Sequence, residues 1–112
     1  GNKVEDFGVG FFTKYGDGAA DVLPLAALRK EQVYELARHL GVPERVVNKA
    51  PSAGLWAGQT DEDEMGVSYR ELDAFLRGEA VSAEAEKTIA WWHERSHHKR
   101  MLPPVPPAPD AL

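Results

Sequence analysis

The fold class is decided by residues 21–41, DVLPLAALRKEQVYELARHLG, in which a short apolar run precedes the clearest helix of the chain. The apolar residues of this helix recur three and four positions apart, as one buried helical face requires: Val33, Leu36, Ala37 and Leu40. This spacing predicts a helix over 27–40 that Gly41 terminates. Residues 21–25 are predicted to form a short strand, and Pro24 places it at a sheet edge because proline cannot donate to a ladder.

The segments around this unit carry weaker signals. Residues 3–12 have apolar side chains at helical spacing, interrupted by two glycines, and predict a short helix. Residues 14–20 hold two glycines around an aspartate and predict a loop. A proline at the first position favours a short helix over 43–48. Residues 54–66, which contain four consecutive carboxylates, are predicted to be a long polar loop.

The last part of the chain is predicted to contain two capped helices and a tail. Ser68 and Glu71 have the spacing of a capping box at the start of a helix that reaches about residue 77. Ser82 is the predicted cap of a last helix that ends near residue 99, with one apolar stripe of Ala85, Ile89 and Trp92. The proline-rich residues 103–112 predict an extended, exposed tail. Since one strand cannot form a sheet, the pattern indicates the end of a larger α/β fold.

The overall composition excludes several classes of protein. The chain has 112 residues, of which 43% are hydrophobic and 28% charged, as in a globular domain. The net charge of -5 argues against a nucleic-acid or anionic-membrane partner. With no cysteine there is no disulfide, thiol nucleophile or cysteine-ligated zinc. No apolar run approaches the length of a membrane span and no signal pattern begins the sequence, so we expect a cytoplasmic protein.

One short motif is typical of metalloproteases. Residues 93–97, HERSH, match H-E-x-x-H, which sets two histidines on one helical face with a glutamate as general base. A catalytic zinc needs a third protein ligand, and Asp110 is the sole candidate among the residues that follow. Exposed polar groups at the end of a helix are the preferred interpretation, and a zinc hydrolase stays an alternative.

Three further features allow two interpretations each. The basic residues 98–100 can contact a phosphate or carboxylate, or can be surface charges that the helix dipole favours, and the sequence leaves both open. The acidic run 61–64 lacks calcium-loop spacing, so an exposed, mobile face is favoured over a cation site. The adjacent aromatic pairs at 11–12 and 91–92 are assigned to packing in a core or interface in preference to stacking on bases.

A longer pattern runs through most of the chain. Its segments, in order, are GNKVE (1–5), GFFTKYGDG (10–18), DVLPL (21–25), APSAGL (50–55), GVSY (66–69) and HKR (98–100). This pattern resembles the ammonia-dependent NAD synthetases, a family of pyrophosphate-loop ATP-dependent enzymes, over residues 1 to about 102. The resemblance implies a Rossmann-like fold with a parallel sheet, of the adenine nucleotide alpha hydrolase type. It also implies that residues 1–102 are the C-terminal part of a synthetase domain, followed by the tail at 103–112.

The resemblance further implies a reaction and a set of site residues. In that family ATP adenylates the carboxylate of deamido-NAD, and ammonia then displaces AMP to form the amide; the enzymes use Mg²⁺ and are homodimers. The residues at matching positions are Glu5 for Mg²⁺, Lys30 and Ser52 for ATP, Lys14, Asp21, His98 and Lys99 for deamido-NAD, and Asp17 for positioning or deprotonating ammonium. The chemical types suit these roles, since Mg²⁺ prefers carboxylates and lysines bind phosphates. Lys30 begins the predicted helix, so its charge and the helix dipole would both favour a triphosphate. The acidic loop at 54–66 matches a family segment that closes over substrate.

The sequence departs from the family pattern in three places. No Ser-Gly-Gly-x-Asp-Ser pyrophosphate loop occurs, Ser52 stands where a threonine is usual, and Asp6 beside Glu5 leaves the magnesium ligand ambiguous. We therefore expect a fragment, beginning at Gly1, that cannot adenylate a substrate alone. A helical interaction module whose proline-rich tail binds an aromatic groove is the alternative from another class.

Overall fold

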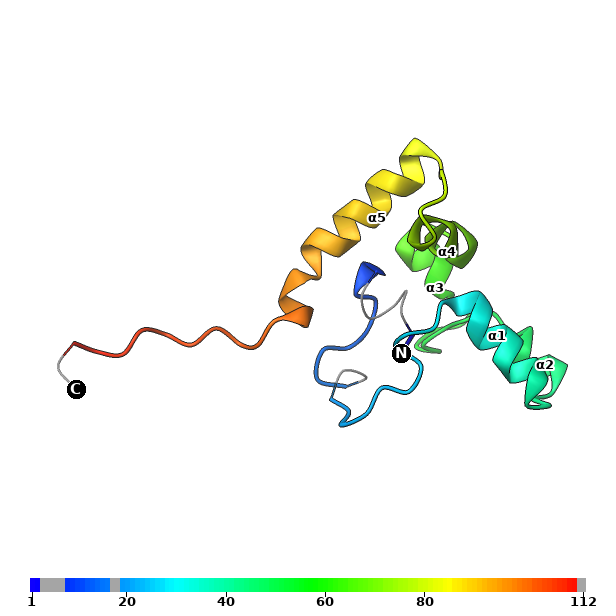
Figure 1. Cartoon of the computed structure of the whole chain (residues 1–112), viewed down its shortest axis with the longest axis horizontal. Helices are drawn as coiled ribbons and strands as arrows, with labels where there is room; N and C mark the ends of the chain where they lie inside the picture. The colour runs from blue at the N-terminus through cyan, green and yellow to red at the C-terminus, as the bar shows by residue number, and fades with distance from the viewer. Residues whose placement is uncertain (3–7, 17–18, 111–112) are drawn as a thin grey trace.

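Helices joined by long irregular segments make up the computed structural model, which describes residues 1–2, 8–16 and 19–110. In chain order the helices are α1 (Lys30–His39), α2 (Glu44–Val47), α3 (Asp61–Met65), α4 (Tyr69–Leu76), α5 (Ala83–Arg95) and the 3-10 helix η2 (His97–Arg100). Helices α1 and α2 lie side by side at one end, and residues 102–110 project from the other end as an exposed, extended tail (Figure 1). The tail was predicted, and it explains why the chain measures 62 × 34 × 31 Å. None of the helices in the described ranges has the length and apolar character to cross a bilayer.

Helix α1 confirms the prediction over 27–40, with a later start. Arg29 precedes the helix, and its backbone N–H donates to the Gln32 Oε1 at 2.9 Å. Yet no residue of α1 is buried, and Leu36 and Leu40 are 38% and 70% exposed. The predicted apolar face is therefore only partly covered in the described part of the chain, since Val33 and Ala37 are half-buried.

The strand predicted over 21–25 is wrong. Residues 24–27 form a turn, in which the Ala26 N–H donates to the Leu23 carbonyl at 3.2 Å and the Leu28 N–H to the Leu25 carbonyl at 2.9 Å. No strand occurs in the described ranges, so the parallel sheet of a Rossmann-like fold is not seen there. A strand needs a neighbour for its backbone donors and acceptors, and without one this proline-containing run satisfies them locally.

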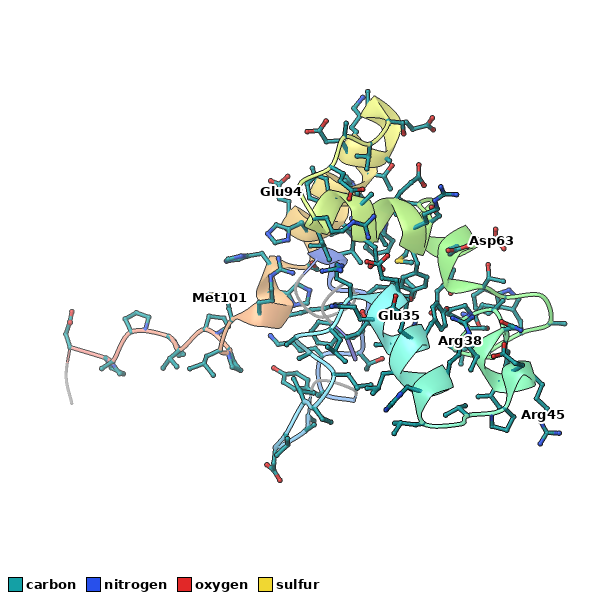
Figure 2. All side chains as sticks on the ribbon, turned by 45° about the vertical axis from the view of Figure 1, so that its right-hand side comes forward. Glu35, Arg38, Arg45, Asp63, Glu94 and Met101 are labelled. Atoms are coloured by element: carbon teal, nitrogen blue, oxygen red, sulfur yellow. The ribbon has the colours of Figure 1, made fainter. Side chains whose placement is uncertain are left out.

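The loop predicted over 54–66 is partly wrong, because its acidic residues form α3. Thr60 caps this helix and accepts a hydrogen bond from the Asp63 N–H at 3.2 Å. All four carboxylates lie in the first turn, where the helix dipole favours negative charge. Each has a hydrogen-bond partner: Asp61 the Tyr69 hydroxyl, Glu62 the Tyr69 N–H, Asp63 the Thr60 hydroxyl and Glu64 the Gln59 amide. The run is thus helical, and the exposed face predicted for it is confirmed at Glu62, Asp63 and Glu64. Figure 2 shows the exposed side chains of Asp63 on α3, Arg38 on α1 and Arg45 on α2.

Helix α5 confirms the Ser82 cap and then ends earlier than predicted. The Ser82 hydroxyl accepts from the Ala85 N–H at 3.1 Å, and Ala85 and Ile89 are buried as expected. The helix predicted to reach about residue 99 stops at Arg95, and the chain tightens into η2. Buried Ser96 lies at this break and accepts a hydrogen bond from Arg100 at 2.8 Å. Within η2 the Lys99 ammonium donates to the Gly10 and Phe12 carbonyls, and these tertiary contacts hold residues 96–100 in the tighter turn.

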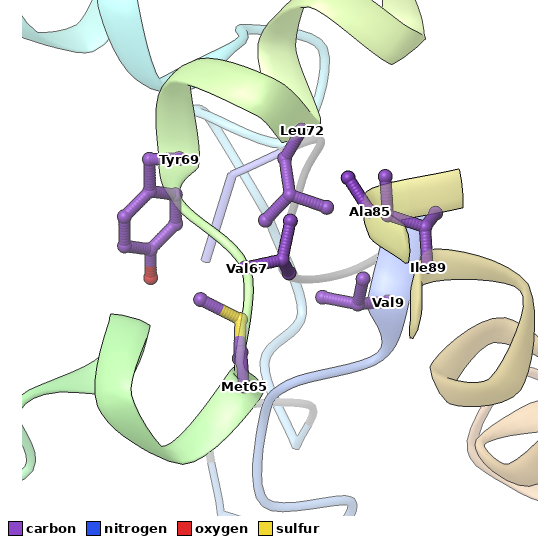
Figure 3. Close-up of a cluster of buried hydrophobic side chains, with 7 residues drawn as sticks. All are labelled: Val9, Met65, Val67, Tyr69, Leu72, Ala85 and Ile89. Atoms are coloured by element: carbon purple, nitrogen blue, oxygen red, sulfur yellow. The ribbon is translucent and has the colours of Figure 1, made fainter. Parts of the chain in front are cut away.

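The core is small and is formed where α3, α4, α5 and the N-terminal segment meet (Figure 3). Its buried members are Val9, Met65, Val67, Tyr69, Leu72, Ala85 and Ile89. Trp92 packs against it and donates from Nε1 to the Met65 carbonyl at 2.8 Å. Phe11 meets Trp92 edge to face, with ring centroids 5.7 Å apart, so these two aromatics pack together as predicted. Of the helix predicted over 3–12, residues 3–7 lie outside the described ranges, and a helical turn remains at 8–9.

The capping box of α4 leads to a prediction about pH. The Ser68 hydroxyl accepts from the Glu71 N–H at 3.2 Å, and the Glu71 carboxylate accepts from the Ser68 N–H and hydroxyl at 3.1 and 2.8 Å. These bonds lower the pKa of Glu71 below its ordinary 4.5. Their stabilisation is therefore present above about pH 4.5 and is lost as the pH falls through the lower folded pKa.

We expect Ser68→Ala to lower the free energy of unfolding by about 1 kcal/mol at pH 7 and by clearly less at about pH 3, measured by urea denaturation. Ser82→Ala is the matched control, because Ser82 caps α5 without a carboxylate at the third helical position, which is Ala85. Its cost should be similar at both pH values. An equal cost of Ser68→Ala at the two pH values would show that Glu71 does not take part.

Candidate functional site

A cavity of about 600 Å³ lies between the N-terminal segment, the connection from α2 to α3, and the end of α5. Its lining consists of Gly1, Phe11, Phe12, Thr13, Ser52, Ala53, Leu55, Gln59, Asp61, Glu64, Trp92 and Lys99. The lining combines aromatic rings with two hydroxyls, an amide, two carboxylates and the ammonium group of a lysine. An apolar wall with a few polar groups is typical of a small-molecule site. Two residues with predicted roles, Ser52 and Lys99, both line this cavity although they are far apart in the sequence.

Ser52 is presented by an irregular segment that a buried glutamine holds in place. The Ser52 hydroxyl accepts from the Gly54 N–H at 3.0 Å and is exposed to the cavity. Gln59, only 7% exposed, accepts from the Leu55 N–H and donates to the Glu64 carboxylate, both at 2.6 Å. Gln59 thus ties the Ser52 segment to α3. Sequence reasoning missed it, because a single glutamine in an irregular segment belongs to no periodic pattern.

Lys99 is placed at the cavity by contacts with main-chain carbonyls. Its ammonium donates to the carbonyl oxygens of Gly10 at 2.8 Å and Phe12 at 2.7 Å, and lies 5.3 Å from the centroid of the Phe12 ring. Burial lowers the pKa of Lys99 below its ordinary value. An ammonium has three N–H donors, so one remains beyond these two carbonyls. Part of the basic cluster at 98–100 therefore holds the segment 10–12, a role that neither interpretation from the sequence included.

One further contact joins α5 to the N-terminal segment, because His93 Nδ1 lies 2.8 Å from the Gly8 carbonyl. Arg100 of η2 donates to the His93 carbonyl at 2.5 Å, which joins η2 to α5. Since α5 ends at Arg95, His93 and His97 are not presented by one α-helical face, and this part of the H-E-x-x-H interpretation is wrong. Across the described ranges, no three His, Cys, Asp or Glu side chains are grouped as metal ligands.

Lys30 lies outside the cavity lining, at the first position of α1. Its ammonium is 4.6 Å from the centroid of the Tyr69 ring. The N-terminus of α1 is already occupied by a carboxylate: Asp73 accepts from the Lys30 N–H at 3.2 Å and from the Glu31 N–H at 2.8 Å. In this structure Asp73 therefore accepts from the N–H groups that were expected to favour a triphosphate, and a role of Lys30 in binding ATP stays a prediction.

Three other predicted site residues in the described ranges do not line the cavity. Lys14 is half-buried with its ammonium 5.3 Å from the Tyr15 ring, while Asp21 and His98 are exposed. Glu5 and Asp17 lie outside the described ranges, so their predicted roles are not tested. The cavity carboxylates Asp61 and Glu64 are hydrogen-bonded to Tyr69 and Gln59, so the described residues do not form a magnesium site.

Comparison with known proteins gives consistent matches over most of the chain. The family model described as NAD synthase matches residues 1–103. The "NH(3)-dependent NAD(+) synthetase" of Mannheimia succiniciproducens is 72% identical over 90% of this chain and 40% of its own length. The protein of the same name from Archaeoglobus fulgidus is 52% identical over 100% of this chain and 47% of its own length.

A solved structure agrees with these matches. The "NMN synthetase from Francisella tularensis" superposes with a TM-score of 0.90 and 59% sequence identity, over 95% of this chain and 44% of that one. The chain thus spans less than half the length of each of these three proteins.

Proposed function

Because this chain belongs to the NAD synthase family, we propose that it is the C-terminal part of an enzyme that amidates deamido-NAD with ammonia. In this reaction the nicotinate carboxylate attacks the α-phosphorus of ATP, and pyrophosphate leaves. Ammonia then adds to the acyl carbon of the adenylate, and AMP leaves with the C–O bond electrons as the amide forms and a proton is released. The products are NAD, AMP and pyrophosphate.

The cavity is the observation that carries this proposal. Its lining includes both Ser52, which we propose contacts ATP, and Lys99, which we propose contacts deamido-NAD. Both substrates must share one site, since the carboxylate of one attacks the phosphate of the other. The Ser52 hydroxyl can donate to a phosphate oxygen, and the third N–H of Lys99 can donate to an anionic group of deamido-NAD. Lys30 would add a positive charge near the phosphates.

The other assignments remain proposals that rest on the family pattern. We assign Mg²⁺ to Glu5, the ammonium to Asp17, and deamido-NAD contacts also to Lys14, Asp21 and His98. When bound, Mg²⁺ would neutralise phosphate charge; the described residues do not supply its ligands, so no step above depends on it. A homodimer in the cytoplasm is the proposed assembly and location.

A second substrate is favoured by one comparison. The 59% identical solved protein bears the name NMN synthetase. The mononucleotide that would yield NMN carries the same nicotinate carboxylate as deamido-NAD but no adenylate half. The chemistry at the carboxylate is unchanged, so the two candidate functions differ only in how the rest of the substrate is bound.

A chimaera tests the proposal. This chain would replace the matching part of the Mannheimia relative, which is 72% identical to it over 101 residues. We expect ATP- and ammonium-dependent amide formation with pyrophosphate release. The kcat/KM values for deamido-NAD and nicotinate mononucleotide then decide between the two substrates.

Lys30→Met in this chimaera should raise the KM for ATP about tenfold, because a charge contact to phosphate is lost. Arg45→Ala, on the exposed surface of α2, is the control that should leave the kinetics unchanged.

The 112-residue chain alone should release no pyrophosphate, since it has no Ser-Gly-Gly-x-Asp-Ser loop. An active parent relative with an inactive chimaera that is folded would contradict the proposed function. No comparison supports the interaction-module alternative, and removal of residues 103–112 from the chimaera should leave its kinetics unchanged.

A further inference from the structure

Helix α4 supplies a buried carboxylate to the start of α1. Asp73 is 2% exposed, and its two oxygens accept from the Lys30 and Glu31 N–H groups at 3.2 and 2.8 Å. These N–H groups belong to the first turn of α1 and have no acceptor within that helix. A negative charge at this end also interacts favourably with the helix dipole. Asp73 therefore fixes the backbone of α1 at Lys30.

The side chain of Lys30 is held from the same helix. Tyr69 precedes Asp73 by one helical turn, so both residues lie on one face of α4. The Tyr69 ring centroid is 4.6 Å from the Lys30 ammonium, a distance at which a cation is attracted to the ring face. Tyr69 is itself only 5% exposed, and its hydroxyl donates to Asp61 at 3.0 Å. The ring is thus fixed beneath the ammonium.

These contacts also connect Lys30 to the cavity. Asp61, which accepts from the Tyr69 hydroxyl, is one of the residues that line the cavity with Ser52. Tyr69 therefore contacts both Lys30 and a residue that lines the cavity with Ser52. A lysine side chain has several rotatable bonds, and restricting it before binding reduces the entropy that binding must overcome.

We propose that Tyr69 and Asp73 are positioning residues for Lys30: Asp73 fixes its backbone and Tyr69 orients its ammonium toward the ATP site. The functional part of this inference rests on the proposed function, because it requires Lys30 to contact ATP. Its structural part concerns only contacts within this chain. The two parts are tested separately, so that failure of one is distinguishable from failure of the other.

The structural part is tested by NMR on the 112-residue chain. In Asp73→Asn, amide hydrogen exchange at Lys30 and Glu31 should accelerate by about tenfold, because the charged acceptor is lost. Arg70→Ala, on the exposed side of α4, should leave these two amides unchanged. The ring-current shift of the Lys30 Hε protons should decrease strongly in Tyr69→Leu, where only the more distant Tyr34 ring remains at 6.0 Å, and should persist in Tyr69→Phe. Unchanged exchange and unchanged shifts would overturn the inference.

The functional part is tested in the chimaera with ATP and deamido-NAD. Tyr69→Leu should raise the KM for ATP about fivefold, with kcat and the KM for deamido-NAD unchanged, whereas Tyr69→Phe should retain the wild-type KM. Leu72→Val is the control for lost stability, since Leu72 is buried in the core on the same helix. It should lower the melting temperature without raising the KM for ATP.

A double variant separates positioning from a general structural role. If Tyr69 acts through Lys30, adding Tyr69→Leu to Lys30→Met should raise the KM for ATP no further than Lys30→Met alone. Multiplying effects in the double variant would contradict the positioning role. If neither the chimaera nor its variants form an amide, the proposed function fails, and the NMR results alone then decide whether Tyr69 and Asp73 hold Lys30.

Discussion

Gly10→Ala is expected to lower the free energy of unfolding by about 3 kcal/mol or more, enough to unfold a marginally stable domain of this size. Gly10 has a φ of 64°, a left-handed conformation that side chains disfavour. A Cβ added there would also overlap the Cβ and hydroxyl of Ser96. Ser96 is 3% exposed and cannot move aside into solvent.

The substitution would affect the cavity as well as stability. The Gly10 carbonyl accepts from Lys99 at 2.8 Å, and the following Phe11 and Phe12 line the cavity. Displacing Gly10 from Ser96 therefore moves the contacts that place Lys99. In the chimaera we expect Gly10→Ala to lose amidation activity at temperatures where the wild type is folded.

Two variants separate the causes of this effect. Gly54 also has a positive φ, 68°, but a Cβ there meets no atom within 4 Å, so Gly54→Ala should cost only about 1 kcal/mol. Ser96→Gly removes the atoms that the new Cβ would overlap, and it should recover part of the stability lost in Gly10→Ala. The measurement is thermal and urea denaturation followed by circular dichroism. Equal costs at Gly10 and Gly54 would show that close packing against Ser96 is not the cause.

Leu72→Ala is expected to cost about 3 kcal/mol, the second large effect. Leu72 is 1% exposed and lies among the seven buried side chains of the core in Figure 3. Removing the isopropyl part of its side chain leaves a cavity at the junction of α4 and α5, and a core this small has few side chains that can move in to fill it. The variant should therefore melt at a much lower temperature than the wild type.

Phe75→Ala is the matched control for Leu72→Ala. Phe75 lies on the same helix and is 39% exposed, so its truncation should cost less than about 1 kcal/mol, although the side chain is larger. Urea denaturation of both variants gives the comparison. A greater loss from Phe75→Ala than from Leu72→Ala would show that the core does not lie where α4 meets α5.

Much of the helical structure could be predicted because its signals are local. The capping box at Ser68 and Glu71, the cap at Ser82 and the apolar spacing in α1 involve residues within one or two turns of each other. The same is true of the proline-rich tail, whose composition excludes a helix. In contrast, α3 was predicted as part of a loop because its carboxylates lie in a polar stretch between Gly54 and Gly66. The helix forms because Thr60 caps it and the dipole of its first turn stabilises the charges.

The candidate site was harder to predict, because its residues come together from distant parts of the chain. The family pattern indicated Ser52 and Lys99 but not the contacts that place them. The helical spacing places Asp73 on the same face of α4 as Tyr69, but nothing in the sequence indicates that its carboxylate caps the N-terminus of α1. The burial of Gln59 had no signal at all.

The sequence by itself determined where most helices begin, which residues can fill a core and which family the pattern resembles. These properties depend on short spacings and residue types, which a linear sequence displays. Only the tertiary structure decided that Asp73 occupies the N-terminus of α1, that Lys99 holds the segment at Gly10 and Phe12, and that α5 ends before His97. The first two result from hydrogen bonds between residues distant in the sequence, and α5 ends where buried Ser96 packs against Gly10. The strength of such contacts depends on burial and geometry, which no local pattern contains.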